Sequence, residues 1–209
     1  LHRRTVSSDG VIHAYTAGQN LAASHRNVQR LQRSLRSRSA GKGATDAQAK
    51  ASALCEAIER YSGVFRGTEP RRRATLTNLA GLAIHPNECM RFSARQYETR
   101  EQINARGSHF NYVPVPFDED VAVDWSPVWS LTHQAHRYLP TEFCYFSYPS
   151  PDERFFCVGC SNGNAAGNTR EEAILQGVLE LVERDSVALW WYNRARRPAV
   201  DVATFDEPF

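Results

Sequence analysis

Residues 46–61 read DAQAKASALCEAIERY, a run of strong helix formers. Thr45 precedes this run as a candidate helix cap, and Gln48 stands three residues later, where its side chain can complete a capping box. Gly63 follows the run, and glycine often marks the end of a helix. We therefore predict a helix over about residues 46–61.

A second helix is predicted over residues 170–193, which read REEAILQGVLELVERDSVALWWYN. Its cap is Thr169 or Asn168, and Glu172 is the matching box residue. A loop of small residues precedes it at positions 161–168. This helix is apolar on most of its circumference, so we expect few of its side chains to face solvent.

The two predicted helices repeat each other. Residues 43–63 align without a gap to residues 167–187, and each copy has a glycine, a capped helix start and the pattern polar-x-x-x-Glu-x-x-Glu-Arg. The matched pairs are Gly43 with Gly167, Thr45 with Thr169, Gln48 with Glu172, Ala49 with Ala173, Ser52 with Gln176, Glu56 with Glu180, Glu59 with Glu183, Arg60 with Arg184 and Ser62 with Ser186.

The spacing of this pattern places its polar residues on one face of each helix, because positions i, i+4 and i+7 share a face. The stripes are Ser52, Glu56 and Glu59 on the first helix, and Gln176, Glu180 and Glu183 on the second. One interpretation is a solvated face held by i,i+4 glutamate–arginine pairs. The other is a set of buried glutamates that holds Mg²⁺ against a polyphosphate, since Mg²⁺ prefers carboxylate oxygens and substrate phosphates.

A Gly41-Lys42-Gly43 turn is predicted before the first helix, where a cation beside a helix N-terminus could hold an anion. The segment lacks the Gly-x-x-x-x-Gly-Lys-Ser/Thr spacing of a P-loop. The sequence therefore disfavours a Walker nucleotide fold.

The remainder of the chain mixes predicted strands with helices. Strands are predicted in the first 23 residues, with a turn near Asp9, and in residues 125–131, 138–145 and 155–159. A polar helical piece is predicted over residues 93–106. This alternation favours an α/β or α+β layered fold, with mixed sheets packed against helices.

Composition and charge are those of an ordinary globular protein. The 25 basic and 23 acidic residues leave a net charge of +2, which gives no support to binding of nucleic acid. An arginine-rich stripe over residues 24–42 is interpreted as a solvated helix face. No stretch is apolar enough to cross a membrane, and the odd count of five cysteines favours reduced thiols in the cytoplasm.

Two weaker patterns are better explained by packing than by a binding site. Cys157-x-x-Cys160 has no second cysteine pair at zinc-site spacing, so buried structural cysteines are favoured over a zinc site. Trp190, Trp191 and Tyr192 at the end of the second helix are assigned to core or dimer packing rather than to a peptide platform. We expect the protein to form a homodimer.

The motifs together resemble the YcaO family. The resemblance rests on the segments at 41–45, 51–62, 161–169 and 180–185, and extends more loosely over about residues 10–205. It is most specific to the YcaO cyclodehydratases of thiazole/oxazole-modified microcin (bacteriocin) pathways. The resemblance implies a non-Walker ATP site and an enzyme that uses ATP to convert Cys, Ser or Thr of a precursor peptide to thiazoline or oxazoline.

The resemblance also implies roles for individual residues. Mg²⁺ would be held by Glu56, Glu59, Glu172, Glu180 and Glu183, and ATP would also contact Lys42, Ser52, Asn168 and Arg184. Arg60 would orient Glu56. The implied partners are a precursor peptide and a leader-binding protein or domain.

The chain is expected to be part of a longer protein. It has no initiator Met, and the proline-rich C-terminus of the cyclodehydratases is absent, so residues 1–209 are interpreted as a partial YcaO domain that is inactive alone. The catalytic residues outside the ATP site are therefore unassigned. Two alternatives stay open: a thioamide-forming YcaO enzyme, and a non-catalytic YcaO-like module that binds a peptide or partner.

Overall fold

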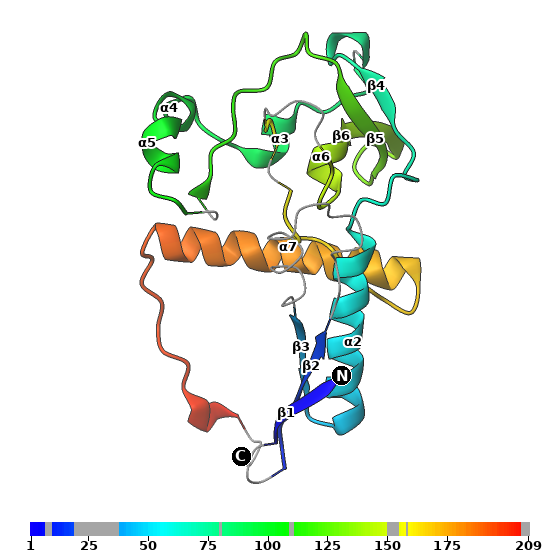
Figure 1. The fold of residues 1–209 in the computed structure, drawn as a ribbon. Helices are drawn as coiled ribbons and strands as arrows, with labels where there is room; N and C mark the ends of the chain where they lie inside the picture. Colours follow the sequence, from blue (N-terminus) through cyan, green and yellow to red (C-terminus); the bar gives the residue numbers. More distant parts are fainter. Residues whose placement is uncertain are drawn as a thin grey trace. The chain divides into compact units, whose positions relative to one another are not determined.

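The computed structural model describes residues 1–6, 10–18, 38–79, 81–108, 111–149, 155–157 and 159–205. The chain divides into two compact units, Leu1–Ser161 and Asn162–Phe209. Figure 1 shows the elements of both units, coloured in chain order.

The first unit begins with a three-stranded antiparallel sheet in the order β1-β2-β3. The strands are β1 (His2–Val6), β2 (His13–Gly18) and β3 (Arg38–Gly43), and helix α2 (Asp46–Ser62) lies along β2 and β3 (Figure 1). The early strands are confirmed, whereas the turn at Asp9 and most of the arginine stripe lie outside the described residues.

Small side chains allow α2 to lie close to this sheet. Ala49 and Ala53 of the helix are fully buried against Tyr15 and Ala17 of β2. Gly41 lies so close to α2 that an added Cβ would collide with the backbone of Ala53. The predicted Gly41-Lys42-Gly43 turn is therefore wrong: these residues end strand β3, and Gly41 is needed for close packing.

A second antiparallel sheet follows in the same unit, in the order β4-β5-β6. Its strands are β4 (Arg72–Ala74), β5 (Val123–Ser130) and β6 (Ala135–Pro140), and its centre is Trp125, which is fully buried and donates its indole N–H to Ala74 O at 2.9 Å. The same unit also has short helices, of which α6 packs on β5 and β6: η1 (Thr77–Leu79), α3 (Pro86–Met90), α4 (Ala94–Glu98), α5 (Arg100–Asn104) and α6 (Thr141–Cys144).

Two predicted strands in this region are wrong in part. Residues 141–144 form α6 rather than the end of a strand, because the chain leaves β6 at Pro140 and Thr141 is buried with its hydroxyl 3.0 Å from that of Ser126. The described residues of 155–159 form no strand, although Phe156 and Cys157 are buried. The polar piece at 93–106 is helical but divided between α4 and α5.

The second unit consists of the long helix α7 (Arg170–Tyr192) and the short turn η3 (Val202–Thr204). Gly177 is the one buried residue of α7, and large apolar side chains such as Leu175, Val182 and Trp191 are more than half exposed. The expectation that this helix has little solvent-facing surface is wrong for this chain. No helix within the described ranges is both long and apolar enough to cross a membrane.

The structure confirms the predicted fold class. Two antiparallel sheets pack with helices in a mixed α/β arrangement, and both long helices occupy the predicted positions to within a residue or two. The two glutamate-bearing helices on which the predicted site depends are therefore both present, as α2 and α7.

Candidate functional site

The two long helices begin with the same arrangement of hydrogen bonds. At the start of α2, Thr45 Oγ1 accepts from Gln48 N at 3.2 Å, and Gln48 Oε1 accepts from Ala44 N at 3.0 Å. The cap residue is confirmed, but the box partner closes onto the residue before the cap instead of the cap itself. An added Cβ at Gly43 would lie 2.8 Å from the Gln48 side chain, so glycine is needed there.

The start of α7 reproduces this entry. Thr169 Oγ1 accepts from Glu172 N at 3.1 Å, and Glu172 Oε2 accepts from Asn168 N at 2.8 Å. Thr169 is therefore the cap, and Asn168 supplies the second donor. An added Cβ at Gly167 would lie 2.6 Å from Ala173 N, which explains the second glycine of the repeat. The helix entry thus orients one carboxylate of the predicted magnesium set, that of Glu172.

In α2 the first glutamate of the Glu-x-x-Glu-Arg pattern is held from two sides. Glu56 Oε2 accepts from the backbone N–H of Ala40 at 2.8 Å, and Oε1 accepts from Arg60 Nε and Nη2 at 3.0 and 2.8 Å. Ala40 lies in β3, an edge strand of the first sheet among the described residues, so the carboxylate satisfies a donor that no described strand pairs with. The prediction that Arg60 orients Glu56 is consistent with this geometry.

Glu180 of α7 is held in the same way. Its Oε2 accepts from the backbone N–H of Gly163 at 2.9 Å, and its Oε1 accepts from Arg184 Nη2 at 3.2 Å. We call each set a glutamate clamp: Ala40, Glu56 and Arg60 form the first, and Gly163, Glu180 and Arg184 form the second. Both clamps fix a carboxylate between an amide that precedes the helix and an arginine one turn later.

Close backbone contact supports the second clamp. Gly177 faces Gly163, and an added Cβ at Gly177 would lie 2.6 Å from Gly163 O. Gly163 has φ +85, a backbone conformation that favours glycine. The two glycines therefore let the loop lie against the helix at the height where its amide reaches Glu180.

The other predicted site residues differ in position and exposure: Lys42 lies in β3, Asn168 precedes the cap of α7, and the others lie on the two helices. Glu59 is half-buried, whereas Ser52, Lys42, Asn168 and Glu183 are exposed. The structure brings together the residues of each helix, and joining the two sets into a single pocket stays a prediction because α2 and α7 belong to different units. The alternative of i,i+4 ion pairs is also realised, in the Glu56–Arg60 and Glu180–Arg184 pairs.

The donor chemistry suits Mg²⁺ without a preformed metal cage. Across the described ranges, no three His, Cys, Asp or Glu side chains gather closely enough to hold a metal ion. Mg²⁺ is commonly bound by one or two carboxylates, with waters and substrate phosphates completing its shell. Glu56 Oε2 and the two oxygens of Glu180 each accept one of the clamp hydrogen bonds, so each keeps a second lone pair for a metal ion, whereas Glu56 Oε1 accepts two bonds from Arg60.

Sequence reasoning missed the backbone donors of the clamps and one buried acid. Ala40 N and Gly163 N carry no residue-specific signal, although the Asn162-Gly163 pair marks a turn. The acid is Glu142 at the start of α6, which lies in a residue run interpreted as a strand. An isolated acid in the otherwise mostly apolar run 138–145 was the available signal.

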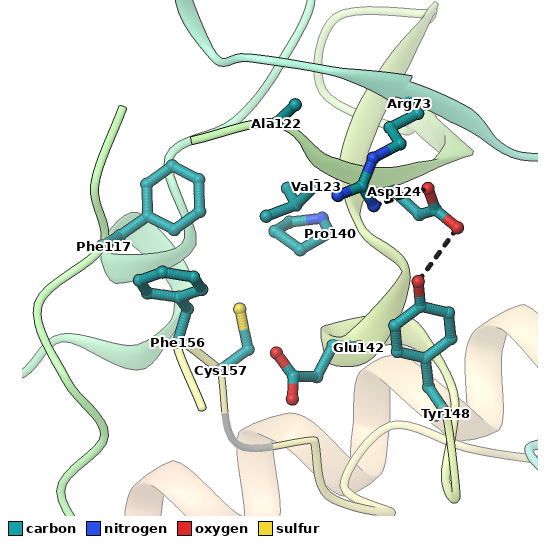
Figure 2. A pocket seen from close by; sticks show the side chains of 10 residues that line it. All are labelled: Arg73, Phe117, Ala122, Val123, Asp124, Pro140, Glu142, Tyr148, Phe156 and Cys157. Carbon is teal, nitrogen blue, oxygen red and sulfur yellow. Dashed lines mark hydrogen bonds and ion pairs between the residues drawn. The ribbon is translucent and has the colours of Figure 1, made fainter. Parts of the chain in front are cut away.

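Glu142 lines a small enclosed cavity of about 20 Å³, the space of one water molecule. Figure 2 shows its carboxyl group beside Cys157 and Phe156. Its Oε1 is buried with no hydrogen-bond partner among the described residues. Burial raises the pKa of Glu142 to about 7, and a hydrogen bond from the Phe156 backbone opposes that rise. This acid is not a member of either glutamate clamp.

Comparisons with known proteins agree on one family. The family model described as YcaO cyclodehydratase, ATP- and Mg²⁺-binding, matches residues 40–208. An uncharacterized protein of Methanothermobacter thermautotrophicus is 33% identical over 168 residues, which are 80% of this chain and 38% of that protein.

Solved structures give the same result. A heterocyclase in complex with substrate and cofactor is 56% identical with a TM-score of 0.91, over 100% of this chain and 28% of its own. The heterocyclase TruD is 64% identical with a TM-score of 0.70, over 76% of this chain and 23% of its own.

A more distant structure shares the fold. YcaO from Methanopyrus kandleri, bound with AMPPCP and Mg²⁺, is 24% identical with a TM-score of 0.59, over 96% of this chain and 41% of its own. The chain spans well under half the length of each of these relatives. By its family match and its glutamate-bearing helices, the chain belongs to the YcaO cyclodehydratase family, which binds ATP and Mg²⁺.

Proposed function

We propose that the protein is an ATP-dependent cyclodehydratase that converts Cys, Ser or Thr residues of a ribosomal precursor peptide to thiazolines or oxazolines. The single observation that carries the proposal is the duplicated glutamate clamp in a chain that belongs to the YcaO family. The similarity to a heterocyclase in complex with substrate and cofactor supports the same reaction class.

The proposed nucleotide site uses both helices. Mg²⁺ is held by carboxylates from the set Glu56, Glu59, Glu172, Glu180 and Glu183, and ATP is contacted by Lys42, Ser52, Asn168 and Arg184. Bound ATP supplies the phosphoryl group that turns the oxygen of an attacked backbone amide into a leaving group. The clamps hold Glu56 and Glu180 in fixed orientations before the nucleotide arrives, which lowers the entropy lost on binding.

This arrangement explains why the arginines belong to the pattern. Arg60 and Arg184 each follow their glutamate by one helical turn and neutralise part of its charge. Without them, glutamates that are brought together around one ion would repel one another before the metal binds. Arg184 can contact phosphate with the donors that its single hydrogen bond to Glu180 leaves.

The proposal also covers the longer protein, its partners and its location. The 209 residues are part of a YcaO domain in a longer protein of a thiazole/oxazole-modified microcin pathway, and activity requires the rest of that protein. Its partners are the precursor peptide and a leader-binding protein or domain, and it works as a homodimer in the cytoplasm. The small fraction of each relative that this chain spans supports the partial domain.

The test is Glu183→Gln in the full-length protein, with Mg-ATP affinity measured by calorimetry. We expect an affinity loss of about tenfold or more, because a carboxylate ligand of the metal loses its charge. Glu171→Gln is the matched control, since Glu171 is an exposed glutamate of the same helix outside the proposed set. Equal affinities for wild type and Glu183→Gln would overturn the ATP site and favour a non-catalytic module.

A further inference from the structure

An open hollow of about 330 Å³ lies beside the second sheet, and its lining includes no residue of either glutamate clamp. Its lining is Phe65, Arg71, Arg73, Asp124, Tyr148 and Pro149. Figure 2 shows Arg73, Asp124 and Tyr148 grouped at one side of the neighbouring cavity. We propose that this hollow binds a peptide carboxylate, from an acidic side chain or a C-terminus.

Among the lining residues that the structure describes, two arginines face one aspartate, so one positive charge has no counterion of its own. Asp124 is paired with both arginines: its Oδ2 lies 3.2 Å from Arg71 Nε, and its Oδ1 lies 3.6 Å from Arg73 Nη1. Glu69, a nearby acid outside the lining, directs its carboxylate to the backbone N–H groups of Arg66 and Gly67 at 2.7 and 2.8 Å. The Asp124 carboxylate thus pairs with two guanidinium groups, and a second carboxylate from a ligand would neutralise the remaining positive charge.

Arg71 is held in place before any ligand arrives. Its Nη1 donates to Gly67 O at 3.0 Å, and its guanidinium lies 5.2 Å from the centre of the Phe65 ring. The Phe65 ring in turn packs edge-on against Tyr148 at 5.0 Å. A fixed guanidinium loses little freedom when it binds an anion, and its planar fork matches a carboxylate.

Arg73 supplies a second, more adaptable arm. Its side chain is 51% exposed, and its pair with Asp124 is the longer of the two. A guanidinium carries five N–H donors, so this arginine can turn toward a new oxygen while it keeps its charge near Asp124. The Tyr148 hydroxyl already donates its hydrogen bond to Asp124 Oδ2 at 2.9 Å. It therefore has no proton left to donate to a bound carboxylate, and the arginines are the donors.

The size of the surplus charge selects the class of ligand. One uncompensated positive charge matches a carboxylate, whereas a phosphate group of charge near −2 would leave a net negative charge in the hollow. Phe65 and Pro149 add an apolar wall against which the carbon stem of an amino acid can pack. Carboxylate binding follows from the hollow alone, and only the peptide as its source rests on the proposed function.

The experiment measures binding of three probes to the full-length protein by ligand-observed NMR. Acetyl-glutamate amide carries a side-chain carboxylate, acetyl-alanine carries a C-terminal carboxylate, and inorganic phosphate is the dianion. We expect carboxylate binding that weakens with added salt, with the tighter probe identifying the source. Phosphate binding as tight as either carboxylate, or no carboxylate binding, would overturn the proposal.

Two variants change the surplus charge in opposite directions. Arg73→Gln removes it and should weaken carboxylate binding about tenfold, the size of a charge-assisted hydrogen bond. Asp124→Asn keeps an acceptor for Tyr148, doubles the surplus and should tighten binding. Arg72→Gln is the control, because Arg72 is an exposed residue of the same strand outside the lining.

Equal effects of Arg73→Gln and Arg72→Gln, or weaker binding by Asp124→Asn that is shown to be folded by circular dichroism, would contradict the site. Mg-ATP affinity is measured on the same samples. It should stay unchanged in Arg73→Gln, so failure of this inference is distinguishable from failure of the nucleotide site.

Discussion

Arg60 donates two hydrogen bonds to a single oxygen of Glu56, through Nε at 3.0 Å and Nη2 at 2.8 Å. The other oxygen of Glu56 is thereby directed toward β3, where it accepts from Ala40 N. The ion pair is partly exposed and adds modest stability by itself. Its larger effect is to fix the direction in which the carboxylate points.

Two substitutions of Glu56 should separate its ion pair with Arg60 from its hydrogen bond with Ala40 N. Glu56→Gln keeps an oxygen for Ala40 but loses the charge that attracts Arg60, and Glu56→Ala loses both. We expect the free energy of unfolding to fall by less than about 1 kcal/mol in the first and by about 1–2 kcal/mol in the second. Urea denaturation checks this, with exposed Glu98→Ala as control, and equal stabilities of Gln and Ala variants would contradict it.

Gly177→Ala should disturb the second clamp. The new Cβ would lie 2.6 Å from Gly163 O, so the loop must move away from α7 and Gly163 N must draw back from Glu180. We expect a loss of stability of about 1–3 kcal/mol, measured by thermal unfolding. Gly18→Ala is the control, since an added Cβ there meets nothing within 4 Å. A wild-type melting temperature for Gly177→Ala would show that this contact is not tight.

Glu142 should make stability depend on pH near neutrality. The folded protein keeps its proton up to about pH 7, whereas an unperturbed glutamate releases it near 4.5. The folded state therefore binds more protons between these values, and the free energy of unfolding falls as the pH rises through this window and levels off above it.

Glu142→Gln should remove this component. Denaturation is measured at about pH 5 and about pH 8, and the variant should lose less stability between them than wild type. The matched control is Glu98→Gln, because Glu98 is an exposed glutamate, and this variant should show the pH dependence of the wild type. A wild-type pH dependence in Glu142→Gln would mean that the carboxyl group ionises freely in the fold.

Thiol labelling should separate the cysteines by burial. Cys55 and Cys160 are exposed, whereas burial raises the pKa of Cys157 and raises that of Cys144 to about 12. Because the thiolate is the reactive form, iodoacetamide at mildly alkaline pH should modify the first two and spare the last two. Mass spectrometry of digested protein reads the sites, and rapid labelling of Cys157 in folded protein would contradict its buried position.

The sequence predicted the long helices well because their determinants are local. Thr45 and Thr169 cap their helices as expected, and the Glu-x-x-Glu-Arg spacing placed each ion pair correctly. These features depend on residues within one or two turns of one another, which a sequence pattern records directly.

The misinterpreted segments depend on distant contacts. The local sequence predicts a turn at Gly41, but the lack of a side chain there allows α2 to pack closely on β3, and no local pattern reveals this contact. The residues after Pro140 contain strand-forming types, yet the buried Thr141–Ser126 contact goes with a helical turn there. Backbone donors such as Ala40 N are invisible to motif analysis because every residue except proline has one.

The amides of the two clamps do not occupy equivalent positions in the repeat. In the gapless alignment of the copies, Ala40 corresponds to Asn164, yet the amide that reaches Glu180 belongs to Gly163. The segment that precedes α7 is therefore shifted by one residue relative to the segment that precedes α2, whereas the two helices align without a shift. We expect a chimera that exchanges residues 38–43 with their aligned counterparts to bring a different amide to Glu56 and to weaken the first clamp.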